Sequence, residues 1–337
     1  MLILYGLYRG YRSSRYYLKL RNPIIILLLS FIAGYLFSCK KVTRDPYSDT
    51  PTSGRIRIAV DENYQPIVED ELQVFKSIYP YAEITPEYLP QLDAFKLLFN
   101  DSVRFLLTDR GLTPQEIKDF NARKLFPREV VVATDAIALI VNPANPDSMM
   151  TVNQLKNIMT GKTKRWKDLD PANPLNHITV VFDNQNSGTV RYVKDSLCEG
   201  ATLSSNLTAL SHNPEVIHYV GSNKEALGII GVCWISNRND PKHLSFLNEI
   251  KVLALSIEQT STWDNTYRPF QAYISLRYYP LARKVYIINT EPRNGLNTGF
   301  ASFIAGEKGQ RIILKAGIVP ANSPTRIVDV HNSDVLQ

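Results

Sequence analysis

The chain alternates apolar strand-like segments with amphipathic segments, and this alternation constrains its fold more than any other feature. Residues 55–60 (RIRIAV) alternate in polarity, which predicts a strand, and residues 67–79 have apolar side chains near helical spacing. Further strands are predicted at 82–88, 104–108, 178–182, 229–235, 251–255 and 284–289, and further helices at 93–99, 113–122, 152–159, 189–197, 213–219, 224–227, 296–305 and 307–316. Strands that alternate with helices predict an α/β fold with mostly parallel sheets.

Two local patterns add detail to this prediction. Thr113, Pro114 and Glu116 occupy the positions of a capping box, which predicts a helix start. Residues 130–142 (VVVATDAIALIVN) form an apolar run that is too long for one ordinary strand and that contains Asp135. This run predicts either two strands or one segment that crosses between two lobes.

Charge and length exclude several classes of protein. The 337 residues amount to about two domains. The net charge is +6, but residues 1–38 contain five basic residues and no acidic one, so the remainder is nearly neutral. A nearly neutral body does not provide the basic surface that nucleic acids require. We therefore expect no nucleic-acid partner.

Motifs for metal, nucleotide and nucleophile chemistry are absent from the sequence. The three cysteines form no CxxC pair, and the five histidines show no HExxH spacing. No GxGxxG follows the first strand, and Gly161-Lys162-Thr163 fails the P-loop pattern because position 156 is lysine. No GxSxG motif is present. We expect no metal, no cofactor and no enzymatic activity.

The N-terminal segment predicts export and lipidation. A basic stretch precedes the 14-residue apolar run 24–37, which is short for a membrane span and typical of a secretory signal. Leu36-Phe37-Ser38-Cys39 resembles a bacterial lipobox, which implies removal of residues 1–38, lipidation of Cys39 and a polar tether over 39–53. Outside the cytosol, Cys198 and Cys233 could form a disulfide or remain two buried thiols.

The turn 183–189 (DNQNSGT) carries the most informative chemistry. It lies between a predicted strand and a predicted helix, so its Ser-Gly-Thr part provides backbone N–H groups, hydroxyls and a helix N-terminus. These groups can hold an anion. Ser187 or Thr189 can equally serve as a helix cap, and the two roles are compatible.

The chain resembles the phosphate-binding proteins of high-affinity phosphate ABC importers over about residues 55–325. The resemblance rests on the order of several segments: Thr108-Asp109 with Leu112-Thr113, 135–143, 155–166, Ser187-Gly188-Thr189, 228–234, 279–281 and 309–320. It implies a type II periplasmic binding protein fold, with two α/β lobes that close on an oxyanion at a hinge cleft. The first lobe would comprise 54–138 and 276–337, and the second 139–275.

The resemblance also implies a set of ligand-binding residues. Ser187, Gly188 and Thr189 match the family's phosphate loop, which Asn186 precedes. Asp109 matches the family's carboxylate, which accepts a hydrogen bond from protonated phosphate and thereby discriminates against sulfate. In the first strand-to-helix loop the family has Thr-Phe, and this chain has Asn63 and Tyr64; Asn63 could also be a simple turn residue.

One position departs from the family pattern. Asp183 stands where the family usually has an arginine, four residues before the serine, and the family's first-lobe serine loop is not evident near 90–93. Arg191 or Arg110 could replace the missing donor, although both could instead be surface charges.

Three functions follow for comparison. The leading hypothesis is a lipid-anchored, extracytoplasmic protein that captures phosphate or a related oxyanion for the permease of an ABC importer. The alternative is an envelope lipoprotein that keeps the fold but serves as a sensor or scaffold, which the Asp183 departure favours. A hydrolase has the least support, because no nucleophile–base motif is present.

Overall fold

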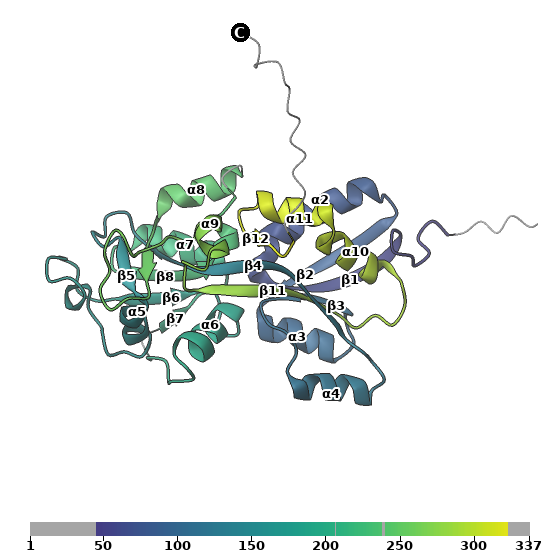
Figure 1. Cartoon of the computed structure of the whole chain (residues 1–337), viewed down its shortest axis with the longest axis horizontal. Helices are drawn as coiled ribbons and strands as arrows, with labels where there is room; N and C mark the ends of the chain where they lie inside the picture. The colour runs from purple at the N-terminus through teal and green to yellow at the C-terminus, as the bar shows by residue number, and fades with distance from the viewer. Residues whose placement is uncertain (1–44, 206, 238–239, 323–337) are drawn as a thin grey trace, which may run out of the picture. The chain divides into compact units, whose positions relative to one another are not determined.

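The computed structural model describes residues 45–205, 207–237 and 240–322 (Figure 1). The predicted signal segment 1–38 and the lipidation site Cys39 lie outside these residues. No helix within the described ranges is long and apolar enough to cross a membrane.

The described chain alternates strands and helices, as predicted. The strands are β1 (Gly54–Asp61), β2 (Ala82–Leu89), β3 (Phe105–Thr108), β4 (Arg128–Val141), β5 (Met149–Thr151), β6 (Thr179–Phe182), β7 (Leu207–Ala209), β8 (Ala226–Gly231), β9 (Lys251–Val252), β10 (Ala254–Ser256), β11 (Ala282–Asn289) and β12 (Val319–Pro320). The α-helices are α2 (Gln65–Ile78), α3 (Gln91–Phe99), α4 (Pro114–Ala122), α5 (Val152–Met159), α6 (Gly188–Tyr192), α7 (Asn213–Ser222), α8 (Pro241–Glu249), α9 (Gln271–Ser275), α10 (Leu296–Ala305) and α11 (Glu307–Lys315). Single turns include η1 (Glu62–Tyr64), η3 (Val193–Leu197) and η4 (Val232–Trp234).

The main sheet has the strand order β2-β1-β3-β11-β4-β8-β6-β7. Its outer strands pair in parallel, as predicted: β2 and β3 with β1, and β7 and β8 with β6. Its central strands pair antiparallel, because β11 runs against both β3 and β4, and β4 runs against β8. The prediction of mostly parallel sheets is therefore wrong at the centre, where the chain crosses the sheet in both directions.

Strand β4 joins the two halves of the sheet. Residues 128–136 pair with β11, and residues 137–141 pair with β8. The long apolar run is therefore one crossing strand, and the two-strand alternative is wrong. We call the strands on the β11 side the first half of the sheet and those on the β8 side the second half.

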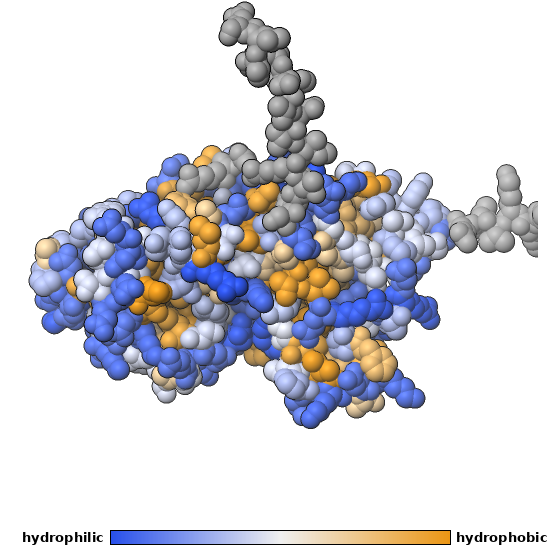
Figure 2. Space-filling model, viewed as in Figure 1, coloured by the Kyte–Doolittle hydropathy of each residue, from blue (hydrophilic) through white to orange (hydrophobic). Residues whose placement is uncertain are grey.

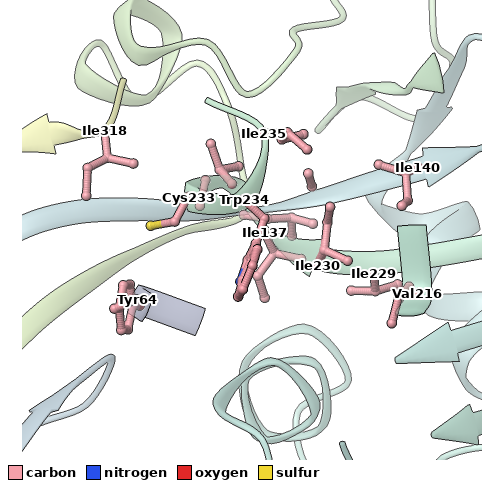
Figure 3. Close-up of a cluster of buried hydrophobic side chains, with 14 of the residues drawn as sticks. Tyr64, Ile137, Ile140, Val216, Ile229, Ile230, Cys233, Trp234, Ile235 and Ile318 are labelled. Carbon is pink, nitrogen blue, oxygen red and sulfur yellow. The ribbon is translucent and has the colours of Figure 1, made fainter. Parts of the chain in front are cut away.

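Helices cover both faces of each half (Figure 1). In the first half, α2, α10 and α11 lie on one face and α3 and α4 on the other, with α10 and α3 both packed on β1. In the second half, α7 and α6 both contact β8. Figure 3 shows the apolar core at the crossing, where Ile137 and Ile140 of β4 lie near Ile229 and Ile230 of β8. Two-sided coverage explains why residues 136–141 of β4 and the whole of β8 are buried and carry no polar side chain.

Local sequence signals place most helix starts correctly. Thr113 and Glu116 form the predicted capping box at α4, and Thr151 and Gln154 form a second one at α5. The predicted helix over 224–227 is wrong, because Ala226 and Leu227 begin β8 and pair with β6. The predicted strand 229–235 ends at Gly231 and continues as η4.

The two cysteines within the described ranges, Cys198 and Cys233, are both buried free thiols. The disulfide alternative therefore does not occur in this structure.

Most of the surface drawn in Figure 2 is hydrophilic, with smaller hydrophobic patches between.

The buried face of α2 contains one ionisable residue. Glu71 lies in the same stripe as Ile67 and Phe75 and is fully buried. Its two carboxyl oxygens have no hydrogen-bond partner among the described residues. Burial raises the pKa of Glu71 to about 9.

Replacing Glu71 with an apolar side chain should stabilise the protein. Glu71→Met should raise the free energy of unfolding by about 1–3 kcal/mol, because it removes an unsatisfied buried polar group. The folded state keeps the Glu71 proton up to about pH 9, whereas the unfolded chain releases it near 4.5. Stability of the original protein should therefore fall as pH rises through this window, and the variant should lose less.

Urea unfolding at pH 6 and pH 8.5 measures both effects. Glu69→Met, on the exposed face of the same helix, serves as the control and should leave the pH dependence unchanged. A Glu71→Met variant that is less stable at both pH values, or equally pH-dependent, would contradict the prediction.

Candidate functional site

The Ser-Gly-Thr turn begins α6 directly after the loop that follows β6. Ser187 is the helix N-cap, and its Oγ accepts a hydrogen bond from the Val190 N–H at 3.2 Å. The same hydroxyl donates to Asp183 Oδ1 at 2.7 Å. The capping interpretation is therefore confirmed. Gly188 and Thr189 are buried and face residues of the first half of the sheet.

Asp109 follows β3 and lies opposite this turn. Its Oδ2 accepts a hydrogen bond from Arg283 Nη1 at 2.7 Å, and its Oδ1 accepts one from Arg191 Nη2 at 2.9 Å. Gln91 Nε2 also donates to Oδ1. Three donors from β11, α6 and α3 thus converge on one buried carboxylate. Of the two arginines proposed from sequence, Arg191 is the one that reaches the site.

Arg283 is a site residue that the sequence analysis missed. It lies on β11, its side chain is 2% exposed, and it is opposite Asp135 of β4 in the strand ladder. Its Nε and Nη2 donate to Asp135 Oδ2 at 3.2 and 3.1 Å. The sequence shows Arg283 directly before the predicted strand 284–289. Only the order of the strands in the sheet, however, brings Arg283 next to Asp109.

The end of β1 supplies Asp61, and the following turn η1 supplies Asn63 and Tyr64. Asn63 Oδ1 accepts a hydrogen bond from Thr189 Oγ1 at 3.2 Å, so Asn63 is more than a turn residue. The Arg283 guanidinium lies 5.6 Å from the centroid of the Tyr64 ring. Asp61 caps η1 through the Asn63 N–H, and its Oδ1 also accepts from Asn63 Nδ2 at 3.0 Å.

Gln91 lies in the segment 90–93, where the resemblance expects the family's first-lobe serine loop. It is the first residue of α3, and its Oε1 accepts a hydrogen bond from Arg191 Nε at 2.7 Å. Its Nε2 donates to Thr108 Oγ1 at 2.9 Å and approaches Asp61 Oδ2 at 3.4 Å. Gln91 therefore links the two carboxylates of the first half to the arginine of the second.

Asp183 is buried behind the turn. Besides the Ser187 hydroxyl, its partner is Asn213 Nδ2 at 3.4 Å. The Asn213 N–H donates to Glu62 Oε1 at 3.3 Å, and His212 Nδ1 lies 3.2 Å from the same oxygen. Within the described ranges, no arginine or lysine is in ion-pair contact with Asp183.

Arg110 and Asn186 lie at the rim of the site. The Arg110 guanidinium binds both Glu116 oxygens, at 2.9 and 3.0 Å, and stacks on Phe95 at 3.6 Å from the ring centroid. The Asn186 carbonyl accepts a hydrogen bond from the Leu92 N–H. Both residues line a cavity of about 260 Å³ that also includes Gln91 and Arg191. Arg110 does not contact Asp109 in this arrangement.

The two arginines and the burial of the site set its charge states. Burial opposes ionisation of Asp109, but Arg283 and Arg191 overcome this effect and lower its pKa. Burial and the nearby Asp109 raise the pKa of Asp61 to about 7. Burial raises the pKa of Asp183 to about 6 and also raises that of Asp135. The described residues contain no cluster of acidic, histidine or cysteine side chains suited to a metal ion.

The fold is that of the two-lobed binding proteins. Residues 45–308 match the family described as PBP superfamily domain, and the chain belongs to this family. The fold is the type II periplasmic binding protein fold predicted from sequence, with two α/β lobes that meet at the crossing strands.

Individual relatives match this chain in sequence over most of their length. The chain is 22% identical over 306 residues to the phosphate-binding protein PstS of Borreliella burgdorferi, covering 88% of this chain and 98% of the relative. It is 25% identical to PstS of Staphylococcus saprophyticus over 211 residues, which is 62% of each chain.

Solved structures show the similarity in fold. A substrate-binding protein from Clostridium perfringens with bound phosphate superimposes with a TM-score of 0.66 at 22% identity, over 80% of this chain and all of that one. An ABC-type phosphate transport receptor from Vibrio cholerae has a TM-score of 0.59 at 20% identity, over 79% of this chain and all of that one. The chain is thus PstS-like.

A side chain at Gly188 should disrupt the site. A Cβ there would lie 2.8 Å from both Asp109 Oδ2 and Asp61 Oδ2. Because Arg283 and Arg191 hold Asp109 in place, Gly188→Ala should break these bonds and lower the free energy of unfolding by about 1–3 kcal/mol. Thermal unfolding tests this, with Ser196→Ala at an exposed position of the next turn as control. Equal stability of the two variants would contradict it.

Proposed function

We propose that this protein captures phosphate, or a related oxyanion, between its two lobes and delivers it to the permease subunits of an ABC importer. The proposal is supported by what its relatives are named for: PstS is a phosphate-binding protein, and one structural neighbour holds phosphate. The observation that carries it is the convergence of Arg283, Arg191 and Gln91 on Asp109, next to Gly188 of the Ser187-Gly188-Thr189 turn.

The lobe boundaries belong to the same proposal. The first lobe comprises 54–138 and 276–337 and the second comprises 139–275, with 1–38 as the signal segment and 39–53 as the tether. The sheet supports this division, because the pairing of β4 changes from β11 to β8 between Ala136 and Ile137. Contacts such as Arg191–Asp109 and Thr189–Asn63 then join one lobe to the other.

Arg283 provides the positive charge that position 183 lacks. It approaches the site from the first lobe, and Arg191 approaches from the second. Guanidinium groups bind oxyanions strongly in a dry site, and Gln91 and Thr189 add neutral donors. Asp109 remains ionised and accepts a hydrogen bond from a protonated phosphate oxygen, which sulfate does not offer at neutral pH.

Capture of this kind forms and breaks no covalent bond, so the proposal assigns no catalytic residue, metal or cofactor. Lobe closure removes water and exchanges it for fixed donors. Ser187 is committed to the helix cap and to Asp183 rather than to a histidine base. This pairing suits an anchoring group better than a nucleophile.

The excess of buried carboxyl groups favours one alternative. Asp61 and Asp183 add negative charge to the place where an anion would bind. A lipoprotein that keeps the fold and acts as an envelope sensor or scaffold would have no need for a cationic site. This alternative expects a stable protein partner and no saturable phosphate binding.

Calorimetric titration of the full chain in mild detergent tests the capture function. Phosphate should bind saturably at pH 6, and sulfate should not. Arg191→Gln should weaken phosphate binding by about 10–100-fold, because it removes a charge-assisted donor. Arg165→Gln is the matched control, since Arg165 pairs with Asp168 at the surface.

Equal loss of affinity in both arginine variants would contradict the assigned site. Absence of saturable binding in the folded protein, after removal of any prebound anion, would favour the sensor or scaffold function.

The proposal places the protein in the cell envelope, attached to a membrane through lipid on Cys39. Cys39→Ser in the full chain should therefore move the protein from the membrane fraction to the soluble fraction, because the variant lacks the thiol that carries the lipid anchor. Cell fractionation with detergent phase separation measures this. Cys198→Ser, at a buried thiol, should leave the distribution unchanged. Identical distributions of the two variants would rule out this anchor.

A further inference from the structure

The binding site contains more carboxyl groups than cations. Four aspartates are buried around it: Asp61, Asp109, Asp135 and Asp183. Two arginines face them, and both are bound to Asp109, while Arg283 also binds Asp135. Asp109 and Asp135 are therefore neutralised by the arginines, and two carboxyl groups remain.

Asp61 is the first of these two. Its hydrogen-bond partners are the amides of Asn63, at 3.1 and 3.0 Å, and of Gln91, at 3.4 Å. No cationic side chain among the described residues forms an ion pair with it. Its Oδ2 and that of Asp109 both lie 2.8 Å from the Cβ position of Gly188, so two carboxyl groups converge on this glycine.

Asp183 is the second. Its partners are the Ser187 hydroxyl at 2.7 Å and Asn213 Nδ2 at 3.4 Å, both neutral. The resemblance to phosphate-binding proteins places a cation at this position. Here a carboxyl group, four residues before Ser187, takes that position instead.

The other titratable groups that contact these aspartates, their partners or Arg283 do not correct this imbalance. Glu62 faces His212 at 3.2 Å, and that histidine is 63% exposed. The Tyr192 hydroxyl donates to the Ala282 carbonyl, and Cys233 Sγ donates to Asp135 Oδ1 at 3.5 Å. Tyr64 lies beneath Arg283 and carries no charge at neutral pH. The site with all four aspartates ionised therefore has a net negative charge before any anion enters.

We propose that this site binds its oxyanion together with protons, with Asp61 and Asp183 entering the complex as neutral carboxylic acids. A proton removes the repulsion between carboxylate and ligand. It also converts an acceptor into a donor, which an oxyanion requires. Asp109, held by both arginines, remains the one carboxylate that accepts a hydrogen bond. The inference rests on the proposed oxyanion-binding function.

The titration behaviour of the two groups agrees with this geometry. Burial raises the pKa of Asp61 to about 7 and that of Asp183 to about 6, so both titrate close to neutral pH. Above pH 7 both are mostly ionised in the free protein and must gain protons for an anion to bind. Affinity for the oxyanion should therefore rise as pH falls from 8 to 5.5.

Proton uptake on binding can be measured directly. The full chain in detergent is titrated with inorganic phosphate at pH 7.5 in buffers with different ionisation enthalpies, and the slope of binding heat against buffer enthalpy counts protons taken up. The original protein should take up about one to two protons per phosphate beyond those that phosphate itself contributes. Asp183→Asn and Asp61→Asn should each reduce the uptake by up to about one proton.

These two variants also predict a change in affinity. Because an amide is neutral at every pH, each variant should bind phosphate more tightly than the original protein at pH 7.5 and with a flatter pH dependence. Ser196→Ala, outside the site, should match the original protein in both measurements. Thermal unfolding of each variant confirms that it is folded.

The outcomes separate the two proposals. Saturable phosphate binding with equal proton uptake in the original protein and in both asparagine variants would overturn the proton-coupled mechanism and leave the capture function standing. Absence of phosphate binding at every pH from 5.5 to 8 would overturn both, since protonated Asp61 and Asp183 should favour binding at the acidic end.

Discussion

A buried guanidinium between two carboxylates organises this structure. Arg283 extends from β11 to Asp109 after β3 and to Asp135 on β4, so one side chain ties together three neighbouring strands. A single charge at this depth would be strongly unfavourable, and the arrangement is stable only because every partner is present and hydrogen-bonded. The same bonds hold Asp109 in the position where it meets Arg191 and Gln91 of the neighbouring elements. The core of the sheet and the functional site therefore depend on one set of contacts.

This arrangement explains how the chain can depart from the pattern of its relatives at position 183. The resemblance expects an arginine in the second lobe, close to the Ser-Gly-Thr turn, and this chain has Asp183 there. In the proposed site, the cation comes instead from Arg283 on β11, a strand remote in sequence. The turn then contributes neutral donors and Arg191, while Arg283 contributes the buried charge. Positive charge is thereby divided between the lobes, and attraction between Arg191 and Asp109 acts across the boundary between them.

The sequence predicts what depends on local patterns. Most of the predicted strands and helices, the capping box at Thr113 and the turn at Ser187 are present in the structure, because each is determined by neighbours within a few residues. The helix predicted over 224–227 failed because pairing with β6 outweighed weak helical propensity. Arg283 and Gln91 could not be assigned from the sequence, since their roles arise from the antiparallel position of β11 between β3 and β4. That strand order is a property of the whole chain.

The remaining carboxyl groups show why stability alone does not account for the site. A core selected only for stability would replace Asp61 and Asp183 with apolar or amide side chains, because burial without a cation disfavours the charged form. Burial raises the pKa of Glu71 in α2 in the same way. Glu71, however, lies in the apolar stripe of its helix, whereas Asp61 and Asp183 flank the Ser-Gly-Thr turn. In the proposed mechanism, Asp61 and Asp183 gain and lose their protons near neutral pH, so the local charge changes with the ligand that binds. The charge of the ligand and the number of protons on Asp61 and Asp183 then depend on each other, whereas the charge of Arg283 stays constant.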